Sequence, residues 1–320
     1  MRCIKVAGVI LSFTIATSAC AEQSTCLERT IPVGIYTKDG TAAPGLNRAN
    51  LIGTYQNKPV SVKSVEVEKR LPRVILLLDT SGSMQIQKAA TLNVAQGVLS
   101  RLPPEMEVGL ALFADVIVRV APPTTDHVKL LAQLEALRRP REYFKGKTAL
   151  WAAITEGAQM IGTPQVGDVV YLISDGRENG SMSHKTDVEA ALGTAGVRLF
   201  SFVTLAIGRD PPPSPEDDVG RGLSDLQQIV QATGGAQYGV FSSHFIVPPD
   251  LRLDKEGKTT PLGFSVDFQL WLLLNFYHVD IDLPQTVKKP GSWKLDLLGL
   301  SKSQRDNLVL TYPRMLFPCG

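Results

Sequence analysis

The fold is decided by one stretch, VILLLDTSGS at residues 74–83. Its first residues are all Val, Ile or Leu, which is typical of a strand buried on both faces within a parallel sheet. The strand ends abruptly in an acid, hydroxyl residues and a glycine, and helical spacing follows, with Leu92, Ala95 and Leu99 on one side. The polar residues therefore lie between the carboxyl end of a strand and a helix, where open α/β sheets bind ligands.

Three oxygen-bearing side chains on this loop are candidate metal ligands. Asp79, Ser81 and Ser83 alternate along the chain, and alternate residues of a tight loop can point the same way. Carboxylate and hydroxyl oxygens are hard donors, which suit a small hard cation, Mg²⁺ before Mn²⁺ or Ca²⁺.

This Asp-x-Ser-x-Ser pattern resembles the metal-ion-dependent adhesion site (MIDAS) of von Willebrand factor A (VWA) domains. Two later segments complete the resemblance. Residues 146–150, GKTAL, resemble the family's Gly-Thr-x-Leu turn with Lys147 as an extra residue, and residues 171–176, YLISDG, resemble its strand-Asp-Gly segment. The resemblance implies an α/β, Rossmann-like fold, in which helices cover both faces of a mostly parallel sheet.

The resemblance also implies a role for each residue. Ser81 and Ser83 are direct ligands, Thr148 binds directly or through water, and Asp79 and Asp175 act largely through water. One position on the cation stays open for an Asp or Glu carboxylate of a partner protein. The alternative from the residues alone is that the two serines cap a helix and Asp175 is a turn residue.

Strands and helices alternate from about residue 72 to residue 241, a pattern that predicts a sheet between two layers of helices. The predicted strands are 74–79, 108–113, 116–120 (an antiparallel edge), 168–174, 197–207 and 236–241. The predicted helices are 85–102, 126–137 with Asp126 as N-cap, 148–161, 187–192 and 223–232.

The flanks have a β pattern. Residues 31–36 and 60–67 predict strands and residues 38–40 a hairpin turn, in a layout that resembles the segment preceding the A domain in an Acidobacteria-type group of exported proteins. Beyond residue 245 helical spacing disappears, and strands are predicted at 278–283, 293–297 and 308–312. The apolar run 270–274 is too short for a membrane and predicts a buried strand. We therefore expect a signal peptide at 1–21, a β segment at 22–71, the VWA domain at 72–243 and an antiparallel β module at 244–320.

The first residues predict export. Arg2 and Lys5 precede a mostly apolar stretch, and Ala19-Cys20-Ala21 fits a cleavage site, so the mature chain is expected in the periplasm or secreted, with no membrane span. The alternative is lipoprotein processing, with a lipid anchor at Cys20. Cys26 and Cys319 then remain, and are either bridged or two free thiols.

Charge indicates the kind of partner. A net charge of +2 over 320 residues, without a basic helix, gives no indication of nucleic-acid binding. Basic residues precede Thr148, and their field would favour an acidic partner unless they form only a solvated loop. They are Arg138, Arg139, Arg141, Lys145 and Lys147. The proline-rich residues 211–215 either shape access to the metal or form a stiff exposed loop.

The sequence predicts no catalytic residue. Residues 78–82, LDTSG, superficially resemble the Asp-Thr-Gly signature of aspartic proteases, but no second copy follows. Serine hydrolases need a nucleophile elbow, phosphate loops a Gly-x-x-x-x-Gly-Lys motif and zinc sites a Cys/His cluster, and none is present. The predicted function is metal-dependent protein binding. The alternatives are a scaffold subunit of an envelope complex with a structural metal and, less favoured, a hydrolase.

Overall fold

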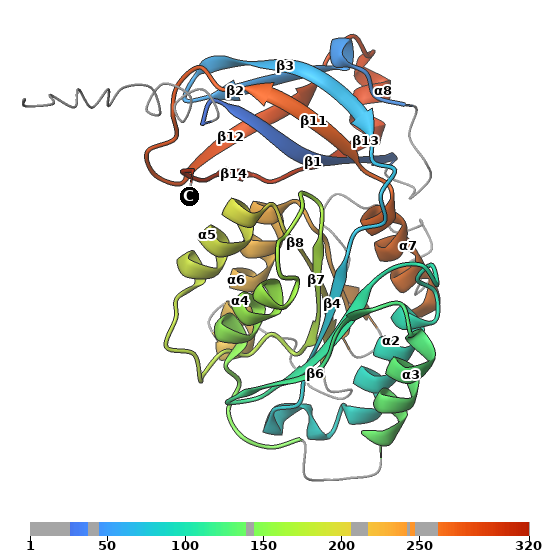
Figure 1. Ribbon diagram of the computed structural model, residues 1–320. Coiled ribbons are helices and arrows are strands. Elements are labelled where there is room, and N and C mark those ends of the chain that lie inside the picture. Colours follow the sequence, from blue (N-terminus) through green and yellow to red (C-terminus); the bar gives the residue numbers. More distant parts are fainter. Residues whose placement is uncertain are drawn as a thin grey trace, which may run out of the picture.

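The computed structural model describes residues 26–37, 45–138, 144–205, 217–241, 244–246 and 262–319, which form two seven-stranded sheets. One sheet is mostly parallel and is covered by helices on both faces, and the other lies beyond one end of it (Figure 1). The chain enters the parallel sheet after β3 (Lys58–Val67) and returns to the other sheet after α7 (Leu262–Leu274). We call these parts the α/β domain and the β module.

The sheet of the α/β domain has the strand order β10-β9-β8-β7-β4-β5-β6. Pairing is parallel from β9 to β5, whereas β6 and β10 are antiparallel edges. The predicted alternation and the antiparallel edge strand after residue 115 are therefore confirmed. The strands are β4 (Val74–Asp79), β5 (Val108–Phe113), β6 (Ile117–Thr124), β7 (Val169–Ser174), β8 (Arg198–Thr204), β9 (Gln237–Phe241) and β10 (His244–Ile246).

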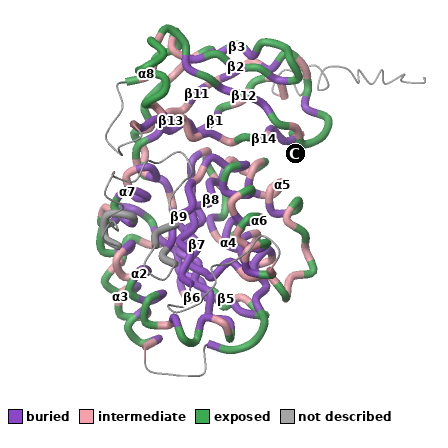
Figure 2. The backbone as a smooth tube through the Cα atoms, turned by 180° about the vertical axis from the view of Figure 1, so that it is seen from behind, coloured by how far each residue is buried: buried purple, intermediate pink, exposed green. Residues whose placement is uncertain are grey.

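Alternate residues of β4 pack against different helix layers, as period-2 geometry requires. Ile75 and Leu77 lie in the core beneath α4, α5 and α6, whereas Leu76 and Leu78 lie in the core beneath α2, α3 and α7. Both faces are buried, so the strands at the centre of the domain are buried almost throughout (Figure 2). The helices are α2 (Lys88–Leu99), α3 (His127–Ala136), α4 (Leu150–Met160), α5 (Lys185–Ala195), α6 (Asp218–Thr233) and α7. The Asp126 carboxylate accepts a hydrogen bond from Lys129 N at 3.0 Å, which confirms the predicted N-cap.

The strand predicted at 270–274 is wrong, because these residues end helix α7. The run from Phe268 to Leu273 is apolar at nearly every position, and such a run does not distinguish a buried helix from a buried strand. The one polar side chain in it, Gln269, is fully buried and accepts a hydrogen bond from the Tyr171 hydroxyl while donating to Ser201 O at 2.9 Å. The helix belongs to the packing of the α/β domain, although it was expected within the β module.

The end of α7 is held by a buried arginine. Arg198 donates to Leu273 O at 2.7 Å and to Gly167 O at 3.0 Å, so a carbonyl at the helix end is satisfied by a side chain. Its guanidinium lies 4.0 Å from the centroid of the Phe276 ring. Burial lowers the pKa of Arg198 to about 9.

The two β segments form one antiparallel sheet instead of separate modules. Its order is β13-β1-β11-β3-β2-β12-β14, so strands from the two ends of the chain interleave. All seven contribute to one hydrophobic core, in which Trp293 and Tyr312 make an edge-to-face contact. Besides β3 they are β1 (Glu28–Thr37), β2 (Leu51–Tyr55), β11 (Tyr277–Asp282), β12 (Gly291–Leu297), β13 (Leu308–Thr311) and β14 (Met315–Leu316), with the short helix α8 (Lys302–Asn307) before β13.

A disulfide closes this module. Cys26, just before β1, is bonded to Cys319, just after β14, and their Cα atoms are 5.8 Å apart. The bridged alternative is therefore the one found. The cross-link joins the segments whose strands already interleave.

A salt-bridged aspartate lies where the two parts meet. The Asp168 carboxylate accepts hydrogen bonds from Arg70 Nη1 at 2.8 Å, Arg73 Nη2 at 2.7 Å and the backbone N–H of Gln165 at 3.0 Å. Arg70 and Arg73 connect β3 to β4, and Asp168 immediately precedes β7. Strands β4 and β7 therefore begin beside the β module and end at the far side of the α/β domain (Figure 1).

Several predictions fall outside the described residues: the signal peptide and Cys20, the turn at 38–40, Arg139 and Arg141, and residues 211–215. Within the described ranges, no helix combines the length and apolar character that a membrane crossing requires.

Candidate metal centre

The first loop of the site follows β4. Asp79 is fully buried, and its Oδ1 accepts a hydrogen bond from the backbone N–H of Ser81 at 2.9 Å. The hydroxyl oxygens of Ser81 and Ser83 are 3.2 Å apart. Ser81 is the residue before the 3₁₀ turn Gly82–Gln85, yet its side chain makes no capping hydrogen bond. The structure therefore contradicts the alternative in which Ser81 is a helix cap.

The second loop carries Thr148 and is bonded to the first. The Gly82 N–H donates to Gly146 O at 3.1 Å, and the Lys145 N–H donates to Thr80 O at 3.0 Å. Thr148 is buried, 2% exposed, whereas Lys147 is exposed. The extra residue before the threonine is thus accommodated on the outside of the loop, and Thr148 stays on the inside.

The third loop follows β7, which is paired in parallel with β4. Asp175 is the residue after β7 and is buried, and its charge acts directly on Asp79. Arg177 forms an ion pair with it, with its Nε 3.5 Å from Asp175 Oδ2, and the Arg177 side chain is 43% exposed. The structure therefore brings Asp79, Ser81, Ser83 and Asp175 to one edge of the sheet and places Thr148 on a loop bonded to it.

Three supporting residues were missed in the sequence. Ser174 Oγ donates to Asp79 Oδ2 at 2.6 Å, and Asn179 Oδ1 accepts from the Thr148 N–H at 2.8 Å. Glu178 Oε2 accepts from the Trp151 N–H at 2.9 Å, which places a carboxylate at the positive amino end of α4. All three lie within four residues of Asp175, so the polar run SDGREN at 174–179 was the available signal.

The electrostatics of the site favour a bound cation. Burial and then the neighbouring charge of Asp175 raise the pKa of Asp79 from 3.8 to about 7, although hydrogen bonds from Ser174 and Ser81 oppose the shift. Two carboxylates in a buried site repel each other, and a positive charge between them removes this cost. Among the described residues, the hydrogen-bond donors to Asp79 are neutral, the Ser81 N–H and the Ser174 hydroxyl.

The donor chemistry also fits a small divalent ion. Adjacent ligands of an octahedral Mg²⁺ are about 3 Å apart, since each lies about 2.1 Å from the ion. The separation of 3.2 Å between the Ser81 and Ser83 hydroxyl oxygens is close to this value. Within the described part of the chain, no three or more His, Cys, Asp or Glu side chains form a group that could hold a metal. Any cation here would therefore depend on hydroxyl oxygens as well as carboxylates.

The described basic residues near the second loop lie in different surroundings. Arg138 is engaged on the outer surface of α2 and α3, where it bonds to Glu135 at 2.7 Å and to Gln96 at 2.6 Å. Lys145 and Lys147 are exposed on the loop itself. Only the two lysines, among the described basic residues of the predicted cluster, face solvent next to the site.

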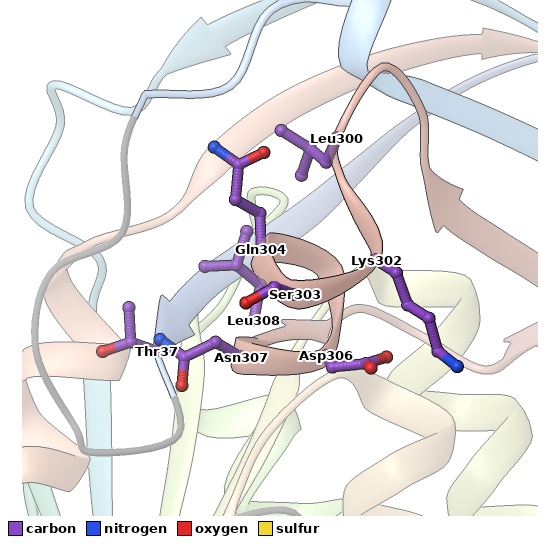
Figure 3. A pocket seen from close by; sticks show the side chains of 8 residues that line it. All are labelled: Thr37, Leu300, Lys302, Ser303, Gln304, Asp306, Asn307 and Leu308. Carbon is purple, nitrogen blue, oxygen red and sulfur yellow. The ribbon is translucent and has the colours of Figure 1, made fainter.

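A separate pocket of about 810 Å³ lies in the β module, beside α8 (Figure 3). Its side chains come from the end of β1, from the segment before α8, from α8 and from the start of β13. They are Thr37, Leu300, Lys302, Ser303, Gln304, Asp306, Asn307 and Leu308. Lys302, Ser303 and Asp306 are exposed, so the pocket lacks the buried, convergent polar groups of the loops after β4 and β7.

The solved structures that are similar to this chain include two bacterial proteins. The conserved hypothetical protein BatB from Bacteroides thetaiotaomicron is 21% identical over 53% of this chain and 91% of its own, with a TM-score of 0.43. An aerotolerance-related membrane protein from Bacteroides fragilis NCTC 9343, with multiple mutations to serines, is 17% identical over 63% of this chain and 98% of its own, with a TM-score of 0.44.

Among the curated proteins none matches this chain. A family model does match, and it covers residues 48–232, which is more than half of the chain. The match includes all three loops described above and confirms the VWA-type domain. The chain belongs to the family described as VWA domain containing CoxE-like protein.

Proposed function

We propose that this protein binds a protein partner through a divalent cation, Mg²⁺ before Mn²⁺ or Ca²⁺, held by Asp79, Ser81, Ser83, Thr148 and Asp175. The observation that carries the proposal is the pair of buried carboxylates, Asp79 and Asp175, beside two hydroxyl oxygens 3.2 Å apart. Only two of the five residues are charged, so a bound cation would keep affinity for a further carboxylate. VWA domains are generally interaction modules, so the match of this chain to a VWA family supports the proposal.

The protein's own groups prepare the site. Ser174 and the Ser81 N–H orient the Asp79 carboxylate, and Asn179 fixes the loop of Thr148. The partner would be a protein that presents an Asp or Glu side chain. We further propose that the mature chain is exported, periplasmic or secreted, with or without a lipid on Cys20, as in the Acidobacteria-type group that its first β segment resembles.

The alternative of a structural metal has a specific observation in its favour, because a cation would offset the burial and the repulsion from Asp175 that together raise the pKa of Asp79. A hydrolase is less supported. Both carboxylate oxygens of Asp79 already accept hydrogen bonds within the protein, and the residue is fully buried, so it is not placed to reach a substrate. A screen for peptidase and esterase turnover tests that alternative.

The direct test is metal binding by calorimetry, followed by capture of partners with and without EDTA. Asp79→Ala and Ser83→Ala should abolish Mg²⁺ binding and EDTA-sensitive capture while the far-ultraviolet circular dichroism stays unchanged. Asp306→Ala and Ser303→Ala are matched controls, since both residues are exposed on α8 in the β module. Wild-type Mg²⁺ affinity in either site variant contradicts the proposal. Loss of the fold on chelation favours the structural metal.

A further inference from the structure

Three large apolar side chains are exposed on loops that are hydrogen-bonded to the loop of Thr148. Met182 is 98% exposed, Ile86 is 87% exposed and Val116 is 66% exposed. A single exposed apolar residue needs no explanation, but such residues gathered around a polar site mark an interaction surface. We call these three residues the apolar ring.

The ring residues lie on three different loops, and each loop is bonded to the loop of Thr148. Ile86 follows the turn that begins at Gly82, whose N–H donates to Gly146 O. Met182 follows Gly180, whose N–H donates to Thr148 O at 2.9 Å.

Val116 lies in the turn between β5 and β6, and this turn also contacts the loop of Thr148. The Ala149 N–H donates to Ala114 O at 2.7 Å. Gly146 has a φ of 90°, and a Cβ there would lie 3.1 Å from Asp115 Oδ1, so the two loops are in close contact. Three segments distant in sequence therefore carry exposed apolar side chains on loops that contact the loop of Thr148.

The same loops carry exposed positive charge. Lys145 and Lys147 flank Gly146, and Arg177 is 43% exposed next to Asp175. The acids of the site are buried, with Asp79 at 0% and Asp175 at 2% exposure. The exposed carboxylate of Asp115 also lies beside Gly146, so the surface that a partner meets is apolar with charges of both signs, whereas the oxygen donors are recessed beneath it. A carboxylate of a partner must therefore extend inward to the recessed oxygen donors, while the residues that flank it contact the exposed loops.

We propose that the partner is a protein segment in which an Asp or Glu is flanked by apolar side chains, and that Ile86, Val116 and Met182 receive those flanking residues. The inference rests on the proposed function for the central carboxylate. It adds the sequence class of the partner, which the metal alone does not specify.

The test uses three short synthetic peptides, with central Leu-Asp-Leu, Ser-Asp-Ser and Leu-Asn-Leu, titrated by NMR into the protein with Mg²⁺. The Leu-Asp-Leu peptide should bind about tenfold more tightly than Ser-Asp-Ser, because its side chains remove apolar surface of the ring from water. The Leu-Asn-Leu peptide should bind more weakly than Leu-Asp-Leu, since it lacks the carboxylate.

A ring variant, Ile86→Ser with Val116→Ser and Met182→Ser, should lose the preference for Leu-Asp-Leu over Ser-Asp-Ser and keep the wild-type affinity for Mg²⁺. The matched control is Val67→Ser with Val128→Ser and Leu298→Ser, since these residues are also exposed but lie away from the three loops. The control should retain the tenfold preference.

Equal affinities of the two Asp peptides for the wild-type protein, or no binding of Leu-Asp-Leu at millimolar concentration with Mg²⁺ bound, would overturn the inference. Binding to phosphatidylserine vesicles that the ring variant loses would identify a lipid surface as the occupant and overturn it as well. Absence of Mg²⁺ binding is a different result, because it removes the proposed function. If the protein binds no Mg²⁺ but still prefers Leu-flanked peptides, and the ring variant loses this preference, the result supports the apolar ring independently of the metal.

Discussion

The two ends of the central strands each bury an aspartate, but in opposite surroundings. Asp168, where β7 begins, is fully buried and bonded to two arginines. Asp79, where β4 ends, is equally buried but has a second carboxylate as its neighbour. Burial raises the pKa of both acids. At Asp168 the backbone N–H groups of Gln165 and Arg73 and the Arg70 guanidinium outweigh it, and the pKa is lowered.

The difference lies in whether the charge of the buried carboxylate is balanced by cations of the chain itself. The charge of Asp168 is compensated within the chain by Arg70 and Arg73, so its carboxylate has little remaining affinity for an added cation. The charge of Asp79 is not compensated by any side-chain cation bonded to it among the described residues. A site that stores uncompensated charge in a recess is suited to a cation supplied from outside.

The largest effect is expected at Asp168. Asp168→Ala should lower the free energy of unfolding by about 3–5 kcal/mol, because it leaves two arginines without their carboxylate at the junction of the two parts. Urea denaturation measures it. Asp225→Ala breaks the more exposed ion pair with Lys185 and should cost less than about 1 kcal/mol. Equal losses in the two variants would remove the contrast between the strand ends.

The second prediction concerns pH and Asp79 in EDTA. The pKa of Asp79 is about 7 in the folded chain against 3.8 as its ordinary value, so the folded state holds this proton more tightly. Its contribution to stability is complete below the lower value and is lost as the pH rises through the higher one.

Asp79→Asn removes this ionisation and keeps an acceptor for the Ser81 N–H. The difference in unfolding free energy between the variant and the wild type should therefore change in favour of the variant, by about 2–4 kcal/mol from about pH 4 to about pH 8. The comparison cancels groups such as Asp168, whose lowered pKa acts in the opposite direction. Parallel pH curves for the two proteins would count against an uncompensated Asp79.

The third prediction adds the cation. At about a hundredfold excess over its Kd, Mg²⁺ should raise the free energy of unfolding by about 2.7 kcal/mol. At one constant Mg²⁺ concentration the gain should be larger at pH 8 than at pH 5, because the carboxylates must be deprotonated to bind metal and the Kd is therefore lower at pH 8. Thermal melts with Mg²⁺ and with EDTA measure it. Asp79→Asn should show almost none of the gain, and an unchanged gain in that variant would place the ion elsewhere.

The smallest effect is expected for the exposed lysines. Lys145→Ala with Lys147→Ala should slow association of the Leu-Asp-Leu peptide about threefold at low salt, because the local field is weaker. Stopped-flow rates at several ionic strengths measure it. Lys288→Ala with Lys289→Ala, exposed in the β module, is the control. An association rate that does not depend on ionic strength would show that the lysines do not steer the encounter.

Most of the α/β domain was predictable because its signals are local. Strand 108–113 has the predicted bounds, and strand β7 differs from its prediction by one residue. Helix α7 was missed, because its apolar run carries no periodicity and its identity is set by packing under the sheet. The joining of the β segments was also beyond the sequence, since β1 pairs with β11 at Glu28 and Asp282, far apart in the chain.

The candidate site divides in the same way. The loop that holds Asp79, Ser81 and Ser83 was readable as one short pattern, and the structure keeps its members together. The polar run 174–179 was an available signal for Ser174, but its hydrogen bond to Asp79 was not predictable, because a serine next to an acid has many ordinary roles. Its function depends on the pairing of β4 with β7, which a short motif does not encode.

The interleaved strand order of the β module sets an order of events during synthesis. Strands β4 to β9 are complete once residue 241 has been made, and neighbouring strands can pair as they emerge. Strands β1 and β3 must wait for β11, which begins at Tyr277, and Cys26 must wait for Cys319. The module that carries both flanking segments is therefore the last part of the molecule to become whole. A chain halted before residue 277 would carry the loops after β4 and β7 on a nearly finished domain, while β1 and the paired strands β2 and β3 still lacked their partner strands β11 and β12.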